Sequence, residues 1–140
     1  MDCRFNYDNS ILDCYVINYG VFIMSLYLRY KNKTLYVLNE SVIWNKHKLP
    51  NNTLELQLKK INEEQDEVEA AETYSEKIKE LGDVLIAIGG VARFDKQFAK
   101  ELYTRFTTGI DKYLYMDIVD EAEKKLPELW KRTYADGYHH

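Results

Sequence analysis

Cysteine is scarce in this sequence of 140 residues, which contains only Cys3 and Cys14. Two cysteines are too few for a scaffold held by several disulfides, and their positions do not match the ligand spacing of a zinc site. Small secreted folds that depend on disulfides, and structural zinc modules, are therefore excluded. We expect both cysteines to be free thiols in the reducing environment of the cytoplasm.

Concentrated positive charge and uninterrupted apolar runs are also lacking. The formal net charge is −4, and the sequence has no basic stripe of the kind that nucleic-acid-binding proteins carry. Residues 11–28 are numerous enough to span a bilayer, but Asp13, Asn18 and Gly20 interrupt them, and a charge inside a spanning helix is costly. No basic segment with a small-residue cleavage site precedes this stretch. We therefore expect neither a nucleic-acid partner nor a membrane partner.

What is present is an ordinary globular composition, with 46% hydrophobic and 30% charged residues. One domain of this length can bury enough surface to form a real core. The residue usage changes near Asn39, because tyrosine, valine, isoleucine and leucine dominate before it and glutamate, lysine, leucine and alanine after it. This change predicts an N-terminal extension over residues 1–38 and a main domain over residues 39–140.

The extension has the character of β structure. Residues 21–30 and 34–38 are rich in β-branched and aromatic side chains, which are enriched in strands. Between them, residues 31–33 (Lys-Asn-Lys) would form the turn of a hairpin. The extension carries no catalytic pattern, so we predict a short β element there that the activity of the main domain does not require.

From Asn39 onward the hydrophobic periodicity is helical. Apolar residues recur three or four positions apart, as on the buried face of an amphipathic helix. Asn52 or Thr53 and then Asp95 are suitable N-caps, and Pro127 would end the last helix. Short connections between helices of this length favour an all-α, antiparallel bundle. The expected helices cover residues 41–46, 53–71, 75–92, 96–106 and 110–126.

Two acidic motifs carry most of the functional information. The first reads E-E-Q-D-E over residues 63–67, and the second reads E-L-G-D over residues 80–83, after twelve intervening residues. At about 100° per residue, Glu64 and Glu67 lie one turn apart beside the apolar stripe of their helix, whereas Glu63 points outward. The two carboxylates thus border the core instead of lying opposite it.

The second motif repeats this placement on the next helix. Two antiparallel helices joined by a short turn would bring the two acidic shoulders together, and four converging carboxylates repel one another unless a cation lies among them. Mg²⁺, with Mn²⁺ as a substitute, suits oxygen ligands, whereas Zn²⁺ is disfavoured because no histidine or cysteine is near. A solvated acidic face would explain the same pattern without metal. The candidate metal ligands are Glu64, Glu67, Glu80 and Asp83.

Together, E-E-x-x-E and E-x-x-D on adjacent helices resemble the motifs of the MazG-like all-α nucleoside triphosphate pyrophosphohydrolases. The resemblance covers residues 39–140 and leaves residues 1–38 unexplained. Gln65 and Asp66 depart from the family, whose members often carry glycine or another small residue there. The other matching stretches are residues 44–47, Gln57, Lys60, Ile61, residues 82–85 and, more weakly, a tail over residues 132–139 that resembles the endings of short, phage-like members.

This resemblance implies Mg²⁺-dependent hydrolysis of a nucleoside or deoxynucleoside triphosphate to the monophosphate and pyrophosphate, by a homodimer or homotetramer. It makes Glu63 or Glu64 the candidate general base for the attacking water. Lys60 would contact a phosphate, or would instead pair with Glu64 across one helical turn. Trp44 and His47 would line the base pocket, although Trp44 could equally be a core aromatic.

Two other functions stay open at this point. One is that of a phosphoribosyl-ATP pyrophosphohydrolase, a related helical enzyme, but we find no residues specific for the phosphoribosyl group. The other is that of a non-catalytic helical module that keeps the bundle as a surface for a partner. The intact acidic motifs argue against this second alternative, because a degenerate copy would be free to lose them.

Overall fold

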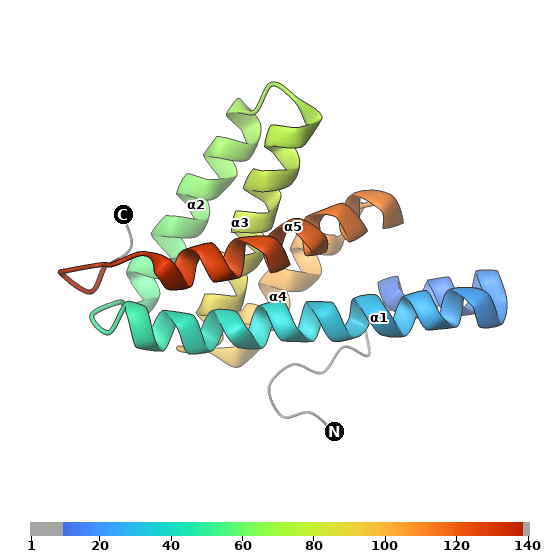
Figure 1. The fold of residues 1–140 in the computed structure, drawn as a ribbon, viewed down its shortest axis with the longest axis horizontal. Helices are drawn as coiled ribbons and strands as arrows, with labels where there is room; N and C mark the ends of the chain where they lie inside the picture. The colour runs from blue at the N-terminus through green and yellow to red at the C-terminus, as the bar shows by residue number, and fades with distance from the viewer. Residues whose placement is uncertain (1–9, 139–140) are drawn as a thin grey trace.

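The computed structural model describes residues 10–138, and its side chains are described from Leu28 onward. Within that range the chain forms five helices and no strand, which confirms the expected all-α class (Figure 1). Among the described residues, no helix has an apolar stretch of the length needed to cross a lipid bilayer. The prediction of two free thiols lies outside the described side chains. The helices are α1 (Ser10–Lys48), α2 (Leu54–Ala70), α3 (Tyr74–Val91), α4 (Lys96–Thr107) and α5 (Lys112–Lys131).

Short polar side chains start four of these helices. Thr53 accepts a hydrogen bond from the amide of Leu56 at the start of α2, and Asp95 does the same for Phe98 at the start of α4. Each bond satisfies a backbone N–H that has no partner inside its helix. The expected caps Thr53 and Asp95 are thus confirmed, and α3 and α5 begin in the same way after Thr73 and Asp111.

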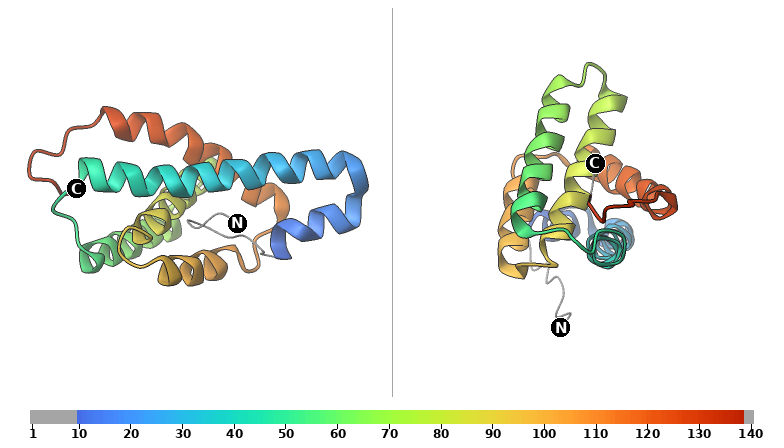
Figure 2. Two further views of the ribbon diagram at one scale, coloured as in Figure 1. Left: turned by 90° about the horizontal axis from the view of Figure 1, so that it is seen from below. Right: turned by 90° about the vertical axis from the view of Figure 1, so that its left-hand side faces the viewer.

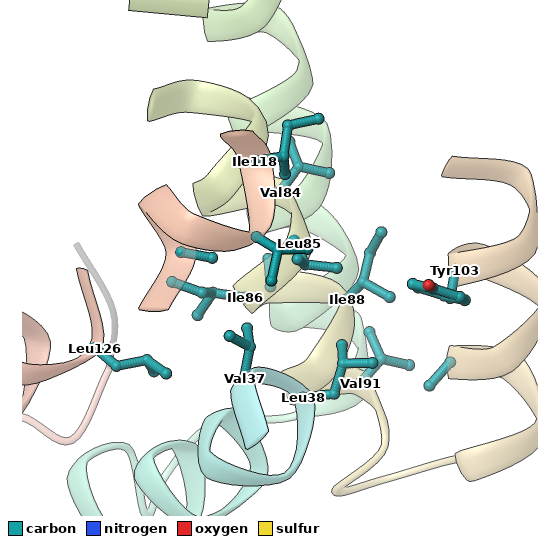
Figure 3. Packing of buried hydrophobic residues seen from close by; sticks show 14 of the residues in the cluster. Val37, Leu38, Val84, Leu85, Ile86, Ile88, Val91, Tyr103, Ile118 and Leu126 are labelled. Carbon is teal, nitrogen blue, oxygen red and sulfur yellow. The ribbon is translucent and has the colours of Figure 1, made fainter. Parts of the chain in front are cut away.

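Helix α3 is the centre of the molecule, because it packs against each of the other four helices. Helices α2 and α3 form an antiparallel hairpin, and α1 and α5 run side by side across the base of that hairpin (Figures 1 and 2). Figure 3 shows side chains of α3 meeting those of α1, α4 and α5 in one apolar core. The fully buried aliphatic residues of this core include Val37, Leu38, Leu85, Val91, Ile118 and Leu126.

Two glycines let α3 approach α1 and α2 closely. A Cβ atom on Gly89 would lie 2.8 Å from the Cβ of Ser41, and one on Gly90 would lie 2.6 Å from Nε2 of Gln57. Real Cβ atoms essentially never make contacts this short, so a larger residue at either position would force its neighbour to shift. The Gly-Gly pair therefore serves helix packing.

The hairpin expected around residues 31–33 is wrong, because that segment lies inside α1. Thr34, Val37 and Leu38 are fully buried on one face of α1, with the spacing of three or four positions that a helix requires. The β-branched and aromatic side chains of residues 21–30 and 34–38 indicated strands, but packing against α3 and α5 overrides that weak local preference. Helix α1 also runs through residue 38 without a break, and its last turns include the short helix expected over residues 41–46.

The prediction that Pro127 ends the last helix is also wrong, since α5 continues to Lys131. Proline has no N–H to donate, so this turn lacks one backbone hydrogen bond. Pro127 is exposed to solvent, whereas Leu126 and Leu129 on either side of it are buried. Apolar packing of these leucines therefore holds the helix together across the proline.

Candidate functional site

A polar cleft of about 290 Å³ lies where the α2–α3 hairpin meets the C-terminal parts of α1 and α5. Both acidic motifs contribute to its wall, so the antiparallel hairpin does bring the two motifs together. Its lining residues are Trp44, Gln57, Lys60, Glu64, Glu67, Glu80, Asp83, Ile86, Ala87, Lys125, Leu129 and Arg132.

Three carboxylates converge inside this cleft. One oxygen each from Glu64, Glu67 and Glu80 lies within 4.8 Å of the other two. Glu64 and Glu67 stand one turn apart on α2, and Glu80 reaches them from the antiparallel α3. Glu64 is only 6% exposed, Glu80 is half-buried, and Glu67 is open to solvent. This set of oxygen atoms could hold a metal ion, as the spacing of the motifs predicts.

Two of these carboxylates have oxygen atoms that are buried and unsatisfied. Oε2 of Glu64 and Oε2 of Glu80 are inaccessible to solvent and accept no hydrogen bond from any described residue. A buried acceptor without a partner costs about 1–3 kcal/mol, and more when it is charged. A cation between the two helices would satisfy both atoms, and their chemistry therefore fits a hard divalent ion.

Burial and mutual repulsion act together on the acidic side chains. Burial raises the pKa of Glu64, the neighbouring charge of Glu67 raises it further, and the ion pair with Lys60 opposes both effects. Burial likewise raises the pKa of Asp83, against the attraction of Lys125. Both carboxylates are therefore less stable in their charged form than they would be in water.

Lys60 lies inside the cleft and pairs with an acidic motif. Its Nζ is 3.0 Å from Oε1 of Glu64 and 4.0 Å from Oε2 of Glu63. Burial lowers the pKa of Lys60, but the hydrogen bond and charge of Glu64 outweigh burial and raise it overall. The helical ion pair that was the alternative role for Lys60 is therefore present, and its ammonium still faces the cleft.

Asp83 lines the cleft but is not part of the three-carboxylate cluster found among the described residues. Its two oxygens lie 3.3 and 3.4 Å from Nζ of Lys125, which projects from α5. The sequence motifs did not identify Lys125, because it stands 42 positions after Asp83, in a helix outside both acidic motifs. Its place beside the buried Leu126 and Leu129 was the only available signal that it borders the core.

The structure does not bring two of the predicted residues to the cleft. The side chain of Glu63 is 52% exposed, and it lines a neighbouring cavity instead. His47 is exposed, its ring lies 5.4 Å from that of Trp130, and it is not among the described residues that line the cleft. Of the two candidate bases, only Glu64 therefore faces the carboxylate cluster.

Trp44 reaches the cleft as part of its buried wall. It is 2% exposed, and its ring packs edge-on against Tyr134 with ring centres 5.9 Å apart. This is the core position that was the alternative reading for Trp44. A ring so deeply buried has no free face on which a nucleobase could stack.

A buried amide network supports the floor of the cleft. The side chain of Gln57 donates to the carbonyl oxygen of Ala87 at 2.7 Å, and its own oxygen accepts from Asn45 at 3.0 Å and from Asn52 at 2.7 Å. These bonds join α1, α2, α3 and the loop before α2. Such a satisfied network fixes the position of α2 relative to α3, and hence of the acidic residues that each carries.

Four carboxylates and three cationic side chains, those of Lys60, Lys125 and Arg132, thus line one cleft. Carboxylates suit a hard divalent cation, and lysine and arginine suit phosphate oxygens. No protein-family model, curated protein or solved structure matches this chain. The functional interpretation therefore rests on the geometry of the cleft and on the motifs in the sequence.

Proposed function

We propose that this protein hydrolyses a nucleoside or deoxynucleoside triphosphate to the monophosphate and pyrophosphate in a Mg²⁺-dependent reaction. The observation that carries the proposal is the convergence of Glu64, Glu67 and Glu80, with two buried oxygens that lack a partner among the described residues. Repulsion among these carboxylates costs free energy, and a divalent cation bound between them would offset that cost. Mn²⁺ would substitute, because it accepts the same oxygen ligands.

Glu64, Glu67 and Glu80 would hold the metal, and Asp83 would join them when it separates from Lys125. A Mg²⁺ ion held there would neutralise phosphate charge and lower the pKa of a coordinated water. The donor set consists of carboxylate oxygens alone, which fits Mg²⁺ or Mn²⁺ and does not fit a preference for zinc.

The cationic side chains of the cleft would bind the triphosphate. Lys60 lines the cleft from α2 and Lys125 lines it from α5, and Arg132 caps the end of α5. Phosphoryl transfer depends mainly on positioning and on charge neutralisation, so cations on two sides of a polyphosphate serve the reaction directly. Arginine adds paired N–H donors that match two phosphate oxygens at once.

Glu64 is the residue that would orient the attacking water. It faces the cluster, whereas Glu63 lies outside the cleft. Its Oε1 is held by Lys60, and its Oε2 is the buried atom without a described partner. That second oxygen would ligate the metal, so Glu64 would orient the attacking water by fixing the ion beside which the water lies.

The non-catalytic alternative has one specific observation in its favour. Lys60 and Lys125 neutralise Glu64 and Asp83 in the absence of any metal, so part of the acidic cleft is already compensated by the chain itself. A module that only binds a partner would need no more than this. The two proposals differ in whether a divalent cation binds the cluster and whether turnover follows.

The decisive experiment measures pyrophosphate release from a panel of nucleoside and deoxynucleoside triphosphates with Mg²⁺. Glu64→Gln and Glu80→Gln should each lower turnover by about 100-fold or more, the scale of losing one preorganised electrostatic contact in the transition state. Glu69→Gln is the matched control, since this exposed residue of α2 lies outside the cleft and should retain activity.

Binding of Mn²⁺ alone, measured by calorimetry, separates the alternatives. Loss of Mn²⁺ binding and of turnover in both cleft variants supports the enzyme. Mn²⁺ binding without turnover of any triphosphate would favour a metal-dependent binding module. If the protein neither binds Mn²⁺ nor turns over a triphosphate, the result would favour a metal-free helical module that binds a partner.

A further inference from the structure

A second cavity of about 450 Å³ adjoins the carboxylate cleft along α2. The two hollows share Gln57 and Lys60 in their walls, so a ligand could extend from one to the other past the ammonium group of Lys60. The residues that line the second cavity are Asn52, Leu56, Gln57, Lys59, Lys60, Glu63 and Tyr138.

The second cavity offers more apolar surface than the carboxylate cleft does. Leu56 is 38% exposed and Tyr138 is 40% exposed, although both are large apolar side chains. In the cleft, by contrast, the aromatic Trp44 is 2% exposed, and the accessible side chains are mostly charged. A flat apolar group attached to a polyphosphate would therefore find a surface beside Tyr138 and none beside Trp44.

Tyr138 is held in place by the loop that connects α1 to α2. The backbone amide of Asn51 donates to the carbonyl oxygen of Gly137 at 3.3 Å. The side-chain amide of Asn51 donates to the backbone carbonyl oxygen of Asp136 at 2.8 Å. The amide of Tyr138 itself donates to the side chain of Asp136 at 3.1 Å. Gly137 has a φ of +75°, and a Cβ there would lie 2.8 Å from the Asn51 side chain. The C-terminal tail is thus built to turn at this glycine and to present Tyr138 beside α2.

We infer that the Leu56–Tyr138 cavity is the nucleoside subsite, in which the base stacks on the ring of Tyr138 and contacts Leu56. Aromatic rings bind nucleobases through their faces with little dependence on base identity, and leucine adds apolar contact. The inference rests on the proposed function, because it assumes a nucleotide whose phosphates lie in the carboxylate cleft. It moves base recognition away from Trp44 and His47 to the C-terminal tail.

The test compares Tyr138→Ala and Leu56→Ser with the unmodified protein. Each variant should raise the KM of the best triphosphate and the Kd of the matching nucleoside monophosphate by about tenfold, equivalent to about 1.4 kcal/mol. Tyr138→Phe, which keeps the ring, should bind as the unmodified protein does. The matched control is Tyr113→Ala, because Tyr113 is 68% exposed and lies outside both cavities.

Inorganic triphosphate, which has no base, and Mn²⁺ alone serve as the remaining probes. Their affinities should stay within about twofold in all variants, because neither probe reaches the second cavity. A general loss of folding would weaken every probe together and would also appear in the circular dichroism spectrum. Selective loss of monophosphate binding in Tyr138→Ala and Leu56→Ser, with Tyr138→Phe intact, supports the subsite.

The outcomes for the subsite and for the proposed reaction are distinguishable. Unchanged monophosphate binding and KM in Tyr138→Ala, with normal turnover, would overturn the subsite and leave the reaction standing. Absence of turnover in the unmodified protein, together with monophosphate binding that depends on Tyr138, would overturn the reaction and support the subsite. Failure of the unmodified protein to bind any nucleoside monophosphate would overturn the subsite in either case.

Discussion

At the scale of single residues, charge pairing decides how the acidic cleft is held together without a metal. Lys60 binds one oxygen of Glu64, and Lys125 binds both oxygens of Asp83. A metal ion bound to Asp83 would share its two oxygens with the ammonium group of Lys125, and the two positive charges would repel each other. Lys125 is therefore a competitor of the metal for Asp83.

Lys125→Met should consequently strengthen Mn²⁺ binding several-fold, since it frees Asp83 and removes a positive charge from the cleft. The same variant should raise the KM for the triphosphate, because a cation that faces the phosphates is lost. Calorimetric titration with Mn²⁺ and steady-state kinetics measure the two effects. The control is Lys124→Met, whose side chain is 76% exposed and lies outside the cleft. Weaker Mn²⁺ binding in Lys125→Met would show that Lys125 organises Asp83 for the metal instead.

Ionisation of Tyr30 should lower the stability of the folded protein at alkaline pH. Its hydroxyl donates to Oδ2 of Asp120 at 2.9 Å, and burial, followed by this carboxylate, raises the pKa of Tyr30 from 10.0 to about 12. The folded state therefore holds this proton more tightly than the unfolded chain does. The resulting contribution to the free energy of unfolding is complete below pH 10 and is lost as the pH rises from about 10 to 12.

Denaturant unfolding at a series of pH values tests this expectation. Tyr30→Phe should be less stable than the unmodified protein near pH 8 and should lose less stability above pH 10. Some loss should persist in the variant, because burial also raises the pKa of Tyr115. Identical pH dependence in the two proteins would show that Tyr30 does not titrate differently in the folded and unfolded states.

At the scale of elements, α1 is the helix that the sequence described least well. Its composition predicted a dispensable extension that ends at residue 38, yet Thr34, Val37 and Leu38 are fully buried against the rest of the bundle. Thr34 and Tyr115 also share a hydrogen bond between their hydroxyl groups. The middle of α1 is therefore part of the core, and a boundary at residue 38 would cut through it.

A protein that starts at Asn39 should accordingly be strongly destabilised and poorly folded. Removing a buried leucine side chain costs about 2–5 kcal/mol, and this truncation removes several buried side chains from a domain with about 5–15 kcal/mol of stability. The unmodified protein keeps all of these side chains and should unfold cooperatively. Circular dichroism during thermal unfolding compares the two. Cooperative unfolding of the shorter protein at an unchanged temperature would restore the boundary predicted from composition.

At the scale of the whole molecule, we predict a homo-oligomer, at least a dimer. The motive from the sequence is the resemblance to a family that builds its pockets across subunits. The structure adds that Leu28, Tyr36 and Ile43 along α1 are each about half exposed, so α1 offers apolar surface to a second copy. Light scattering should give a mass of at least twice 16.6 kDa at micromolar concentration. A fully active monomer would contradict the prediction.

The sequence by itself determined the features that depend on local pattern. The period of the apolar residues identified α2, α3 and α4, and Thr53 and Asp95 marked the starts of two of them, because a cap satisfies amides within its own first turn. The same period placed the acidic residues beside the apolar stripes of α2 and α3, on the surfaces that face each other. Three of the four predicted carboxylates converge for that reason, since a short turn leaves an antiparallel hairpin little freedom.

Only the tertiary structure decided the features that depend on distant parts of the chain. The pairing of Asp83 with Lys125, the burial of Trp44 under Tyr134, and the place of Tyr138 beside α2 all join segments far apart in the sequence. The helical state of the middle of α1 belongs to the same class, because its packing against α3 and α5 outweighs a local preference for strands. Periodicity and spacing report which face of an element is buried, but the partner that buries it is set by how the elements pack together.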